Sequence, residues 1–391
     1  MKIAKDRIWI GVFVITAICV FLLKAWMALT TAGAPDITVW KDFLLHVKQC
    51  GVCVYETGGL MQHAHGSRLN PFNHPPFIIH FLRFVDLVSA VSGVPFEAAF
   101  RIITSIVDLA SAAVVYKLLQ REKLFQPVVF LLYLLAPATI IISGYHGNTD
   151  TLMIFFVLLT ALLIERPEAA GVAFGIALSI KIVPIMFVPV FLFYLTKNRR
   201  WFVTAAAATF LITSVPFLFE SPLVIAREVL GYRGFSGRWG WTQALFAAIG
   251  PGDLFNLITR IAAYLLLALL TYYAVRMNRG AKPPLYFQLA FTAFLFLVFT
   301  PAWGTNYMPW LDPFPGVLGF APAVLYYVAS GSLLGYLYFV KDDESTRLIG
   351  LCWLAVIIVW WFFIQRLKKY ETSMKPHNTK ITKAARTSAK G

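Results

Sequence analysis

Residues 8–29 read IWIGVFVITAICVFLLKAWMAL, and this apolar run decides the class of fold. A helix of about 20 predominantly apolar residues spans a bilayer, whereas the apolar core of a signal peptide has only about 7–15 residues. The run is therefore predicted to be a retained first transmembrane helix. Lys2, Lys5 and Arg7 precede it, which places the N-terminus on the cytoplasmic side of the membrane.

The composition extends this prediction to the whole chain. Hydrophobic residues make up 59% of the 391 residues and charged residues 14%, whereas a soluble domain carries about 45–50% and about 25%. No polar stretch is long enough to form a separate globular domain, which excludes a soluble enzyme on a membrane anchor. The apolar runs are also much longer than the strands of a β-barrel. We predict an all-α polytopic membrane protein with about 11–12 transmembrane helices.

The charge is unevenly distributed along the chain. Residues 1–365 form one predicted integral membrane domain, and residues 366–391 form a basic tail that we expect to be disordered and to lie near anionic lipid headgroups. The net charge of +15 thus indicates membrane lipids and not nucleic acid as a partner. Counted from a cytoplasmic N-terminus, the apolar runs place this tail on the outer side of the membrane. The positive-inside rule, however, requires its basic residues on the cytoplasmic side. One uncounted crossing would reconcile the two.

The apolar run Phe77–Ser92 is expected not to cross the membrane. It carries Arg83 and Asp86 at its centre, which is costly in lipid. If it stays on the surface, the short basic loops 117–123, 197–200 and 276–282 all lie inside. We therefore place it as a half-embedded helix in a long first outer loop, residues 31–95. Three further segments then share the outer face: residues 143–150, 220–242 and 300–315.

Two polar residues stand out in the first outer loop. Asp36 directly follows the first helix, and a carboxylate there can be a base, a helix cap or a solvated charge. His74 lies in NPFNHPPF at 70–77, where Pro75 and Pro76 restrict the backbone. Its side chain can donate to an anionic ligand or bond to the backbone of the turn.

The second outer segment, SGYHGNTDTLM at 143–153, interrupts two apolar helices. Asp150 can cap the following helix, but a cap does not explain Tyr145, His146 and Asn148 beside it. Lys181 interrupts the apolar hairpin ALSIKIVPIM at 177–186. It can snorkel to the membrane surface or contact a phosphate.

The remaining outer segments combine arginine, glycine and aromatic residues. GYRGFSGRWGW at 231–241 contains Arg233 and Arg238, which suit a phosphate but also suit lipid headgroups. TPAWGTNYMPWLDPFP at 300–315 contains Trp303, Asn306 and Tyr307. These residues can form a sugar-binding surface or anchor the chain at the membrane interface.

Metal and nucleotide chemistry find little support. Cys50 and Cys53 can be free thiols, a disulfide, or part of a metal site with His63 and His65. The chain has no Walker loop, no GxGxxG motif, no HExxH and no GxSxG. We predict no bound metal and no cofactor.

The order of these segments resembles the GT-C glycosyltransferases, membrane enzymes that use a sugar linked to polyprenyl phosphate. The similarity is greatest to the mannosyltransferases of phosphatidylinositol mannoside synthesis that depend on polyprenol-phosphate-mannose. It is good over residues 1–200 and weaker through TPAWGTNY. The segments that carry it are PDITVW at 35–40, VCVY at 52–55, FNHPPF at 72–77, FEAAFRI with Arg101, HGNTDTLM at 146–153, and SIKIVPIMFVPVFLFYLTKNRR at 179–200.

The resemblance implies that Asp36 is the catalytic carboxylate, and that Asp150 and its neighbours border the same cavity. As a general base, Asp36 would promote an inverting transfer. The donor phosphate then needs cations or dipoles, for which the candidates are Arg238, Arg233, His74, His146 and Lys181. Candidates for the rest of the cavity are Asp150, Asn148, Tyr145, Trp303, Asn306 and Tyr307.

The predicted reaction moves mannose or another hexose from a polyprenyl-phosphate-linked donor to a lipid or glycan acceptor. It would take place on the extracytoplasmic face of the cytoplasmic membrane, for assembly of a cell-envelope glycan. A flippase or transporter for lipid-linked sugars is the alternative, although the chain shows no internal repeat. A third possibility is a non-catalytic subunit of a glycan-assembly complex.

Overall fold

The computed structural model describes residues 2–58, 72–215, 217–231, 234–279, 282–340 and 345–373. This part of the chain is almost entirely helical, which confirms the all-α prediction. Its α-helices are α1 (Lys2–Thr30), α2 (Pro35–Cys50), α3 (Val54–Thr57), α5 (Phe77–Ser92), α6 (Phe96–Arg121), α7 (Pro127–Leu134), α8 (Pro137–Thr139), α9 (Asp150–Leu162), α10 (Pro167–Ile180), α11 (Val188–Tyr194), α12 (Arg199–Ser214), α13 (Phe217–Glu220), α14 (Pro222–Gly231), α15 (Gly240–Ile249), α16 (Asp253–Arg279), α17 (Leu285–Phe299), α18 (Phe320–Phe339) and α19 (Ser345–Ser373).

Shorter elements connect the α-helices. They are the 3₁₀ helices η1 (Gly51–Cys53), η3 (Val183–Phe187), η4 (Thr305–Trp310) and η5 (Pro315–Leu318), and the π-helix η2 (Ile140–His146). The strands β1 (Phe235–Ser236) and β2 (Ala302–Trp303) pair antiparallel, with Phe235 opposite Trp303.

The described residues include six helices that are long and apolar enough to cross a membrane: Arg7–Thr30, Phe96–Arg121, Pro127–His146, Asp253–Arg279, Phe320–Phe339 and Thr346–Ser373. Shorter apolar helices are Asp150–Leu162, Pro167–Ile180, Val183–Tyr194 and Leu285–Phe299. At about 1.5 Å per residue, a helix of about 14 residues covers only about 21 Å. Several of the 11–12 expected transmembrane helices are therefore too short to cross the full thickness of a bilayer.

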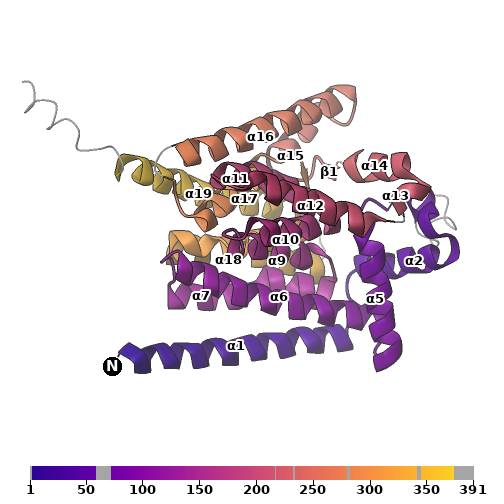
Figure 1. Ribbon diagram of the computed structural model, residues 1–391, viewed down its shortest axis with the longest axis horizontal. Coiled ribbons are helices and arrows are strands. Elements are labelled where there is room, and N and C mark those ends of the chain that lie inside the picture. Colours follow the sequence, from indigo (N-terminus) through magenta and orange to yellow (C-terminus); the bar gives the residue numbers. More distant parts are fainter. Residues whose placement is uncertain are drawn as a thin grey trace, which may run out of the picture.

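The long helices run side by side, with α1 and α16 on opposite sides of the bundle (Figure 1). Three basic loops gather at one end, which we call the basic end. There Arg121 donates to the last carbonyls of α9, and Lys282 donates to the carbonyl oxygen of Tyr194 at 2.9 Å. Arg276 makes a bidentate ion pair of 2.8 and 2.9 Å with Glu371 near the end of α19. α19 therefore ends at the basic end.

The basic tail begins later than expected. We expected disorder from residue 366, but α19 continues as a helix to Ser373. The ion pair between Arg276 and Glu371 ties this last part of α19 to α16. Residues 374–391 of the expected tail lie outside the described residues.

Residues 304–319 connect the two ends of the bundle, which the apolar runs did not reveal. The segment starts beside Asp150, where Asn306 and Trp310 bond to the carboxylate. It ends near the basic end, where the carbonyl oxygen of Pro313 accepts a bond from Tyr286 at the start of α17. We expected residues 300–315 to be an outer loop, but from Trp310 onward the segment runs through the bundle toward the basic end. A backbone that is not a continuous α-helix is tolerated here because protein surrounds it.

The helix α5 matches the predicted bounds Phe77–Ser92. It lies across the direction of the long helices (Figure 1). One of its faces is buried against the bundle, whereas Phe84, Leu87 and Val91 are exposed on the other side. Asp86 pairs with Lys48 of α2 at 2.6 Å. These features fit a helix at the surface of the bundle better than a spanning helix.

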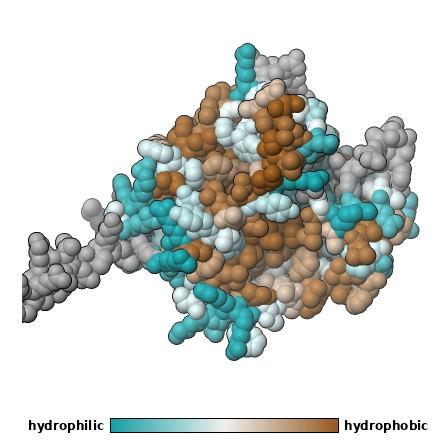
Figure 2. All heavy atoms as spheres, turned by 90° about the horizontal axis from the view of Figure 1, so that it is seen from above, coloured by the Kyte–Doolittle hydropathy of each residue, from teal (hydrophilic) through white to brown (hydrophobic). Residues whose placement is uncertain are grey.

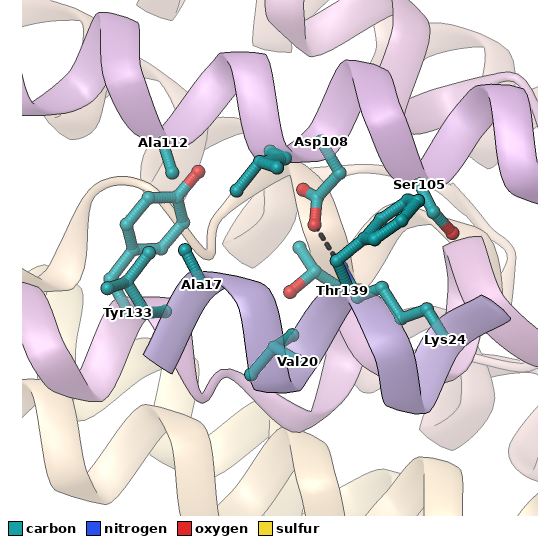
Figure 3. Close-up of a pocket in the computed structure, with 11 residues that line it drawn as sticks. Ala17, Val20, Lys24, Ser105, Asp108, Ala112, Tyr133 and Thr139 are labelled. Atoms are coloured by element: carbon teal, nitrogen blue, oxygen red, sulfur yellow. Dashed lines mark hydrogen bonds and ion pairs between the residues drawn. The ribbon is translucent and has the colours of Figure 1, made fainter. Parts of the chain in front are cut away.

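The helix α1 is joined to the bundle by a buried charge pair. Lys24 of α1 and Asp108 of α6 form an ion pair, beside Ser105 and Thr139 in a cavity of about 20 Å³ (Figure 3). Two charges in apolar helices are expensive in lipid. Each charge therefore compensates the other, and the ion pair fixes the position of α1 against α6.

Apolar side chains also cover much of the outside of the bundle. Figure 2 views the molecule from the side of α16 and shows them over a large part of that face. Leu257, Ile261, Tyr264 and Leu265 of α16 are among the exposed large residues. A contiguous apolar surface of this kind is typical of a face in contact with lipid.

Candidate active site

Six segments of the sequence, between residues 36 and 307, enclose one cavity of about 200 Å³. It lies at the end of the bundle opposite the basic end. Seven of the residues singled out from the sequence line it: Asp36, His74, Asn148, Lys181, Trp303, Asn306 and Tyr307. Aromatic and apolar side chains such as Trp40, Phe43 and Phe235 complete the wall.

Asp36 lies in the first turn of α2, next to Pro35. Its side chain is 50% exposed. One carboxylate oxygen, Oδ2, accepts from His146 Nε2 at 2.9 Å and from Asn148 Nδ2 at 3.3 Å. Burial raises the pKa of the carboxyl, but the hydrogen bond from His146, the charge of Lys181 and the hydrogen bond from Asn148 act against burial, and the pKa lies below its ordinary value. Asp36 is thus an ionised carboxylate at neutral pH.

His146 is held from both sides of its ring. It ends the π-helix η2, and Gly147 follows with a φ of +76°. Its Nδ1 contacts the hydroxyl of Tyr338 at 2.5 Å, and that hydroxyl contacts Thr305 Oγ1 at 3.0 Å. The sequence did not single out Tyr338 or Thr305 as functional. His146 itself is 4% exposed and lies behind Asp36.

Arg101 fixes the junction between α1, α2 and η2. Its guanidinium is almost fully buried and donates to the carbonyl oxygens of Ala28 and Thr31 at 2.8 Å. It also donates to the carbonyl oxygen of Tyr145 at 3.4 Å. The end of α1 and the π-helix are thereby held together, so that Asp36 and His146 meet. Gly33 allows this approach, because a Cβ there would lie 2.9 Å from the Tyr145 carbonyl oxygen.

Asp150 lies behind the cavity wall and is fully buried. Oδ2 accepts from Lys181 and from Asn306, each at 2.7 Å, and Oδ1 accepts from Trp310 at 2.6 Å. Thr149 is the N-cap of α9 and makes no side-chain cap bond. The carboxylate therefore holds Lys181 and Asn306 in the cavity. Lys181 can reach both the Asp150 carboxylate and the cavity because its backbone is extended where α10 ends.

His74 forms another part of the wall. Its ring packs against Trp40, with 4.8 Å between the ring centroids, and its carbonyl oxygen accepts from the Tyr55 hydroxyl at 2.8 Å. Burial, followed by the charge of Lys181, lowers the pKa of His74 to about 3. The ring is therefore neutral at neutral pH and provides a hydrogen bond, not a charge.

A family model describes much of this chain. The model of glycosyltransferase family 87 matches residues 72–301, which is more than half of the chain. The chain belongs to glycosyltransferase family 87. No curated protein matches it significantly. The family supports the membrane glycosyltransferase inferred from the sequence and favours a transferase over a transporter.

Four of the predicted site residues that the structure describes lie outside the cavity of this family 87 chain. The guanidinium of Arg238 packs over the ring of Phe235, which lines the cavity, with 5.5 Å from Cζ to the ring centroid. Tyr145 packs on Tyr338 behind the cavity. The other two are Asp150 and His146, which are both buried behind the cavity. Arg233 lies outside the described residues.

Cys50 and Cys53 form a disulfide at the end of α2. His46 lies beside it, with Nε2 3.4 Å from the sulfur of Cys53. The three ligand atoms lie within 4.8 Å of one another, but in the disulfide neither sulfur is a thiolate that could bind a metal. Of the alternatives left open by the sequence, the disulfide is therefore the one observed. His63 and His65 lie outside the described residues.

Proposed function

We propose that this family 87 protein transfers a hexose, with mannose as the first candidate, from a polyprenyl-phosphate donor to a lipid or glycan hydroxyl. One observation carries the proposal. An ionised carboxylate, Asp36, is half exposed in a cavity of about 200 Å³, and His146 and Asn148 bind it from behind. A cation, Lys181, lines the same cavity.

Asp36 is the general base in this scheme. The acceptor hydroxyl loses its proton to Asp36 while its oxygen bonds to the anomeric carbon of the sugar. The bond from that carbon to the phosphate oxygen breaks on the opposite face, which inverts the configuration. Oδ2 already accepts two hydrogen bonds, so Oδ1 takes the proton. The polyprenyl phosphate departs with the electron pair.

The leaving phosphate gains negative charge in this step and needs a cation in a dry site. Lys181 is the first candidate, because it lines the cavity and Asp150 holds it there. Arg238, at the rim of the cavity over Phe235, is the second. Arg233 precedes it by five positions and is a third. His74 is neutral and would bind a sugar or acceptor hydroxyl instead.

The charge distribution supports an extracytoplasmic active site. The basic loops and the end of α19 gather at one end of the bundle, and basic loops favour the cytoplasmic side. The cavity is at the other end. Its aromatic residues, including Trp40, Trp303 and Tyr307, suit a sugar, and the lipid-facing exterior suits a polyprenyl chain.

A transfer assay on the purified protein in proteoliposomes tests the proposal. The assay offers a panel of radiolabelled polyprenyl-phosphate sugars with native lipid extract as acceptor. We expect wild type to move the label to a new product and Asp36→Asn to reduce the rate at least about 100-fold, as is typical for loss of a general base. Asn can still accept the bond from His146, so the cavity should keep its shape.

Glu97→Gln is the matched control. Glu97 is a carboxylate at the same end of the bundle that pairs with Lys41 at 2.8 Å and does not line the cavity. This variant should transfer at the wild-type rate. Wild-type transfer by a folded Asp36→Asn variant would refute the role of Asp36. Movement of the lipid across the bilayer without transfer from any donor would favour a flippase.

A further inference from the structure

A line of hydrogen bonds runs from Asp36, the proposed general base, into the bundle. It connects Asp36 of α2, His146 of η2, Tyr338 near the end of α18 and Thr305 of η4. The contacts are 2.9 Å from Asp36 Oδ2 to His146 Nε2, 2.5 Å from His146 Nδ1 to the Tyr338 hydroxyl, and 3.0 Å from there to Thr305. Four separate elements thus meet behind one carboxylate.

The donors and acceptors determine the direction of this line. An ionised carboxylate only accepts, so the ring nitrogen that faces Asp36, Nε2, must carry a proton. In a neutral ring the other nitrogen, Nδ1, is then an acceptor, and the Tyr338 hydroxyl donates to it. The oxygen of Tyr338 in turn accepts from the Thr305 hydroxyl. Of the two neutral tautomers of His146, only this one gives every group in the line the partner that it needs.

We infer that Tyr338 is a positioning residue of the transfer reaction, which sets the tautomer of His146 and thereby the hydrogen bond that orients Asp36. The inference rests on the proposed role of Asp36 as the base. With the opposite tautomer, a lone pair of Nε2 would face the carboxylate and repel it. Asp36 would then turn away from the acceptor hydroxyl, although the cavity would remain.

The position of Thr305 joins this line to the substrate cavity. Thr305 lies between Trp303, which lines the cavity, and Asn306, which both lines it and bonds to Asp150. The segment that contacts a bound sugar therefore also holds the hydroxyl of Tyr338. His146 would consequently act through Asp36 and not as a phosphate ligand, the role suggested by its sequence context.

Tyr338→Phe tests the inference, because it removes only the hydroxyl. We expect kcat to fall about 10-fold or more, since loss of the group that orients a histidine yields the wrong tautomer, while KM for the donor stays within about twofold. Tyr336→Phe is the matched control on the same helix. The hydroxyl of Tyr336 is buried and has no partner among the described residues, so this variant should keep the wild-type kcat.

A second measurement needs no activity. The ¹⁵N chemical shifts of the His146 ring, assigned by comparison with His146→Gln, should show a protonated Nε2 and an unprotonated Nδ1 in wild type, and a mixture in Tyr338→Phe. A ring protonated on both nitrogens, or shifts unchanged in the variant, would overturn the inference. So would an unchanged kcat in an active protein, whereas a wild type without transfer activity would count against the proposed function alone.

Discussion

Replacing Asp150 by asparagine should destabilise the protein far more than the loss of a helix cap. Asp150 is fully buried and accepts three hydrogen bonds, two of them at Oδ2 from Lys181 and Asn306, and one at Oδ1 from Trp310. An asparagine side chain has one oxygen and one NH₂ group. In either orientation the NH₂ group faces at least one N–H donor, and Lys181 loses the negative charge that pairs with it.

The size of the effect follows from these contacts. Removing one partner of a buried ion pair costs about 3–5 kcal/mol, because the other charge stays buried without compensation. A cap would behave differently, since asparagine and aspartate are about equally good at the N-cap. We therefore expect Asp150→Asn to lower the free energy of unfolding by about 3–5 kcal/mol. A role as a cap alone predicts a loss below about 0.5 kcal/mol.

Equilibrium unfolding in mixed micelles of detergent and SDS measures this difference. Asp253→Asn is the control, because Asp253 is an exposed residue in the first turn of α16 and should behave as an ordinary helix start. Lys181→Met combined with Asp150→Asn should cost less than the sum of the single changes, since each removes the charge that the other leaves unpaired. A loss of under about 1 kcal/mol for Asp150→Asn, or strict additivity, would refute the reasoning.

Three further outcomes follow from the same contacts. Gly147→Ala should reduce both transfer rate and thermal stability, because φ is +76° and the new Cβ would lie 2.9 Å from Cδ1 of Ile37; Gly51→Ala, with open space around it, controls for the backbone strain alone. Lys24→Met should lower the melting temperature, since Asp108 is left buried and unpaired, and adding Asp108→Leu should restore much of it; no recovery would contradict the pairing. The depressed pKa of Asp36 means that the carboxylate stays ionised as the pH falls through the ordinary value of 3.8, so the acid limb of kcat/KM should lie below that value, and an acid limb near pH 6 would contradict it.

Much of the helical arrangement could be predicted from hydrophobic runs and charge. The bounds Phe77–Ser92 agree with the structure, because prolines precede this helix and a glycine follows it. The sequence could also predict that Asp36, Asn148 and Lys181 line one cavity. Once the basic loops are assigned to one end of a bundle, the polar segments between helices must gather at the other.

The partners inside the bundle could not be predicted in this way. Tyr338 ends an apolar helix, where a tyrosine usually marks the membrane interface, and nothing local indicates that it bonds to His146. Lys24 and Asp108 each stand in an apolar run, and their pairing depends on which helices are neighbours. Single-sequence patterns describe one helix at a time, so contacts between helices distant in the chain stay hidden.

The segment 304–319 shows why this limitation matters for the site as well as for the topology. Its prolines and polar residues break the apolar pattern, so the sequence indicated a loop outside the membrane. Its side chains, however, are largely buried, and Trp310, Asp312 and Phe314 are almost inaccessible. Because tyrosine hydroxyls donate to its backbone carbonyl oxygens at Met308, Asp312 and Pro313, the chain can return through the core without a regular α-helix. The return brings α19 to the basic end, as the charge rule required, and it begins with the residues that hold Asp150 and Tyr338. The segment 304–319 therefore both completes the topology of the bundle and positions the residues behind the proposed base.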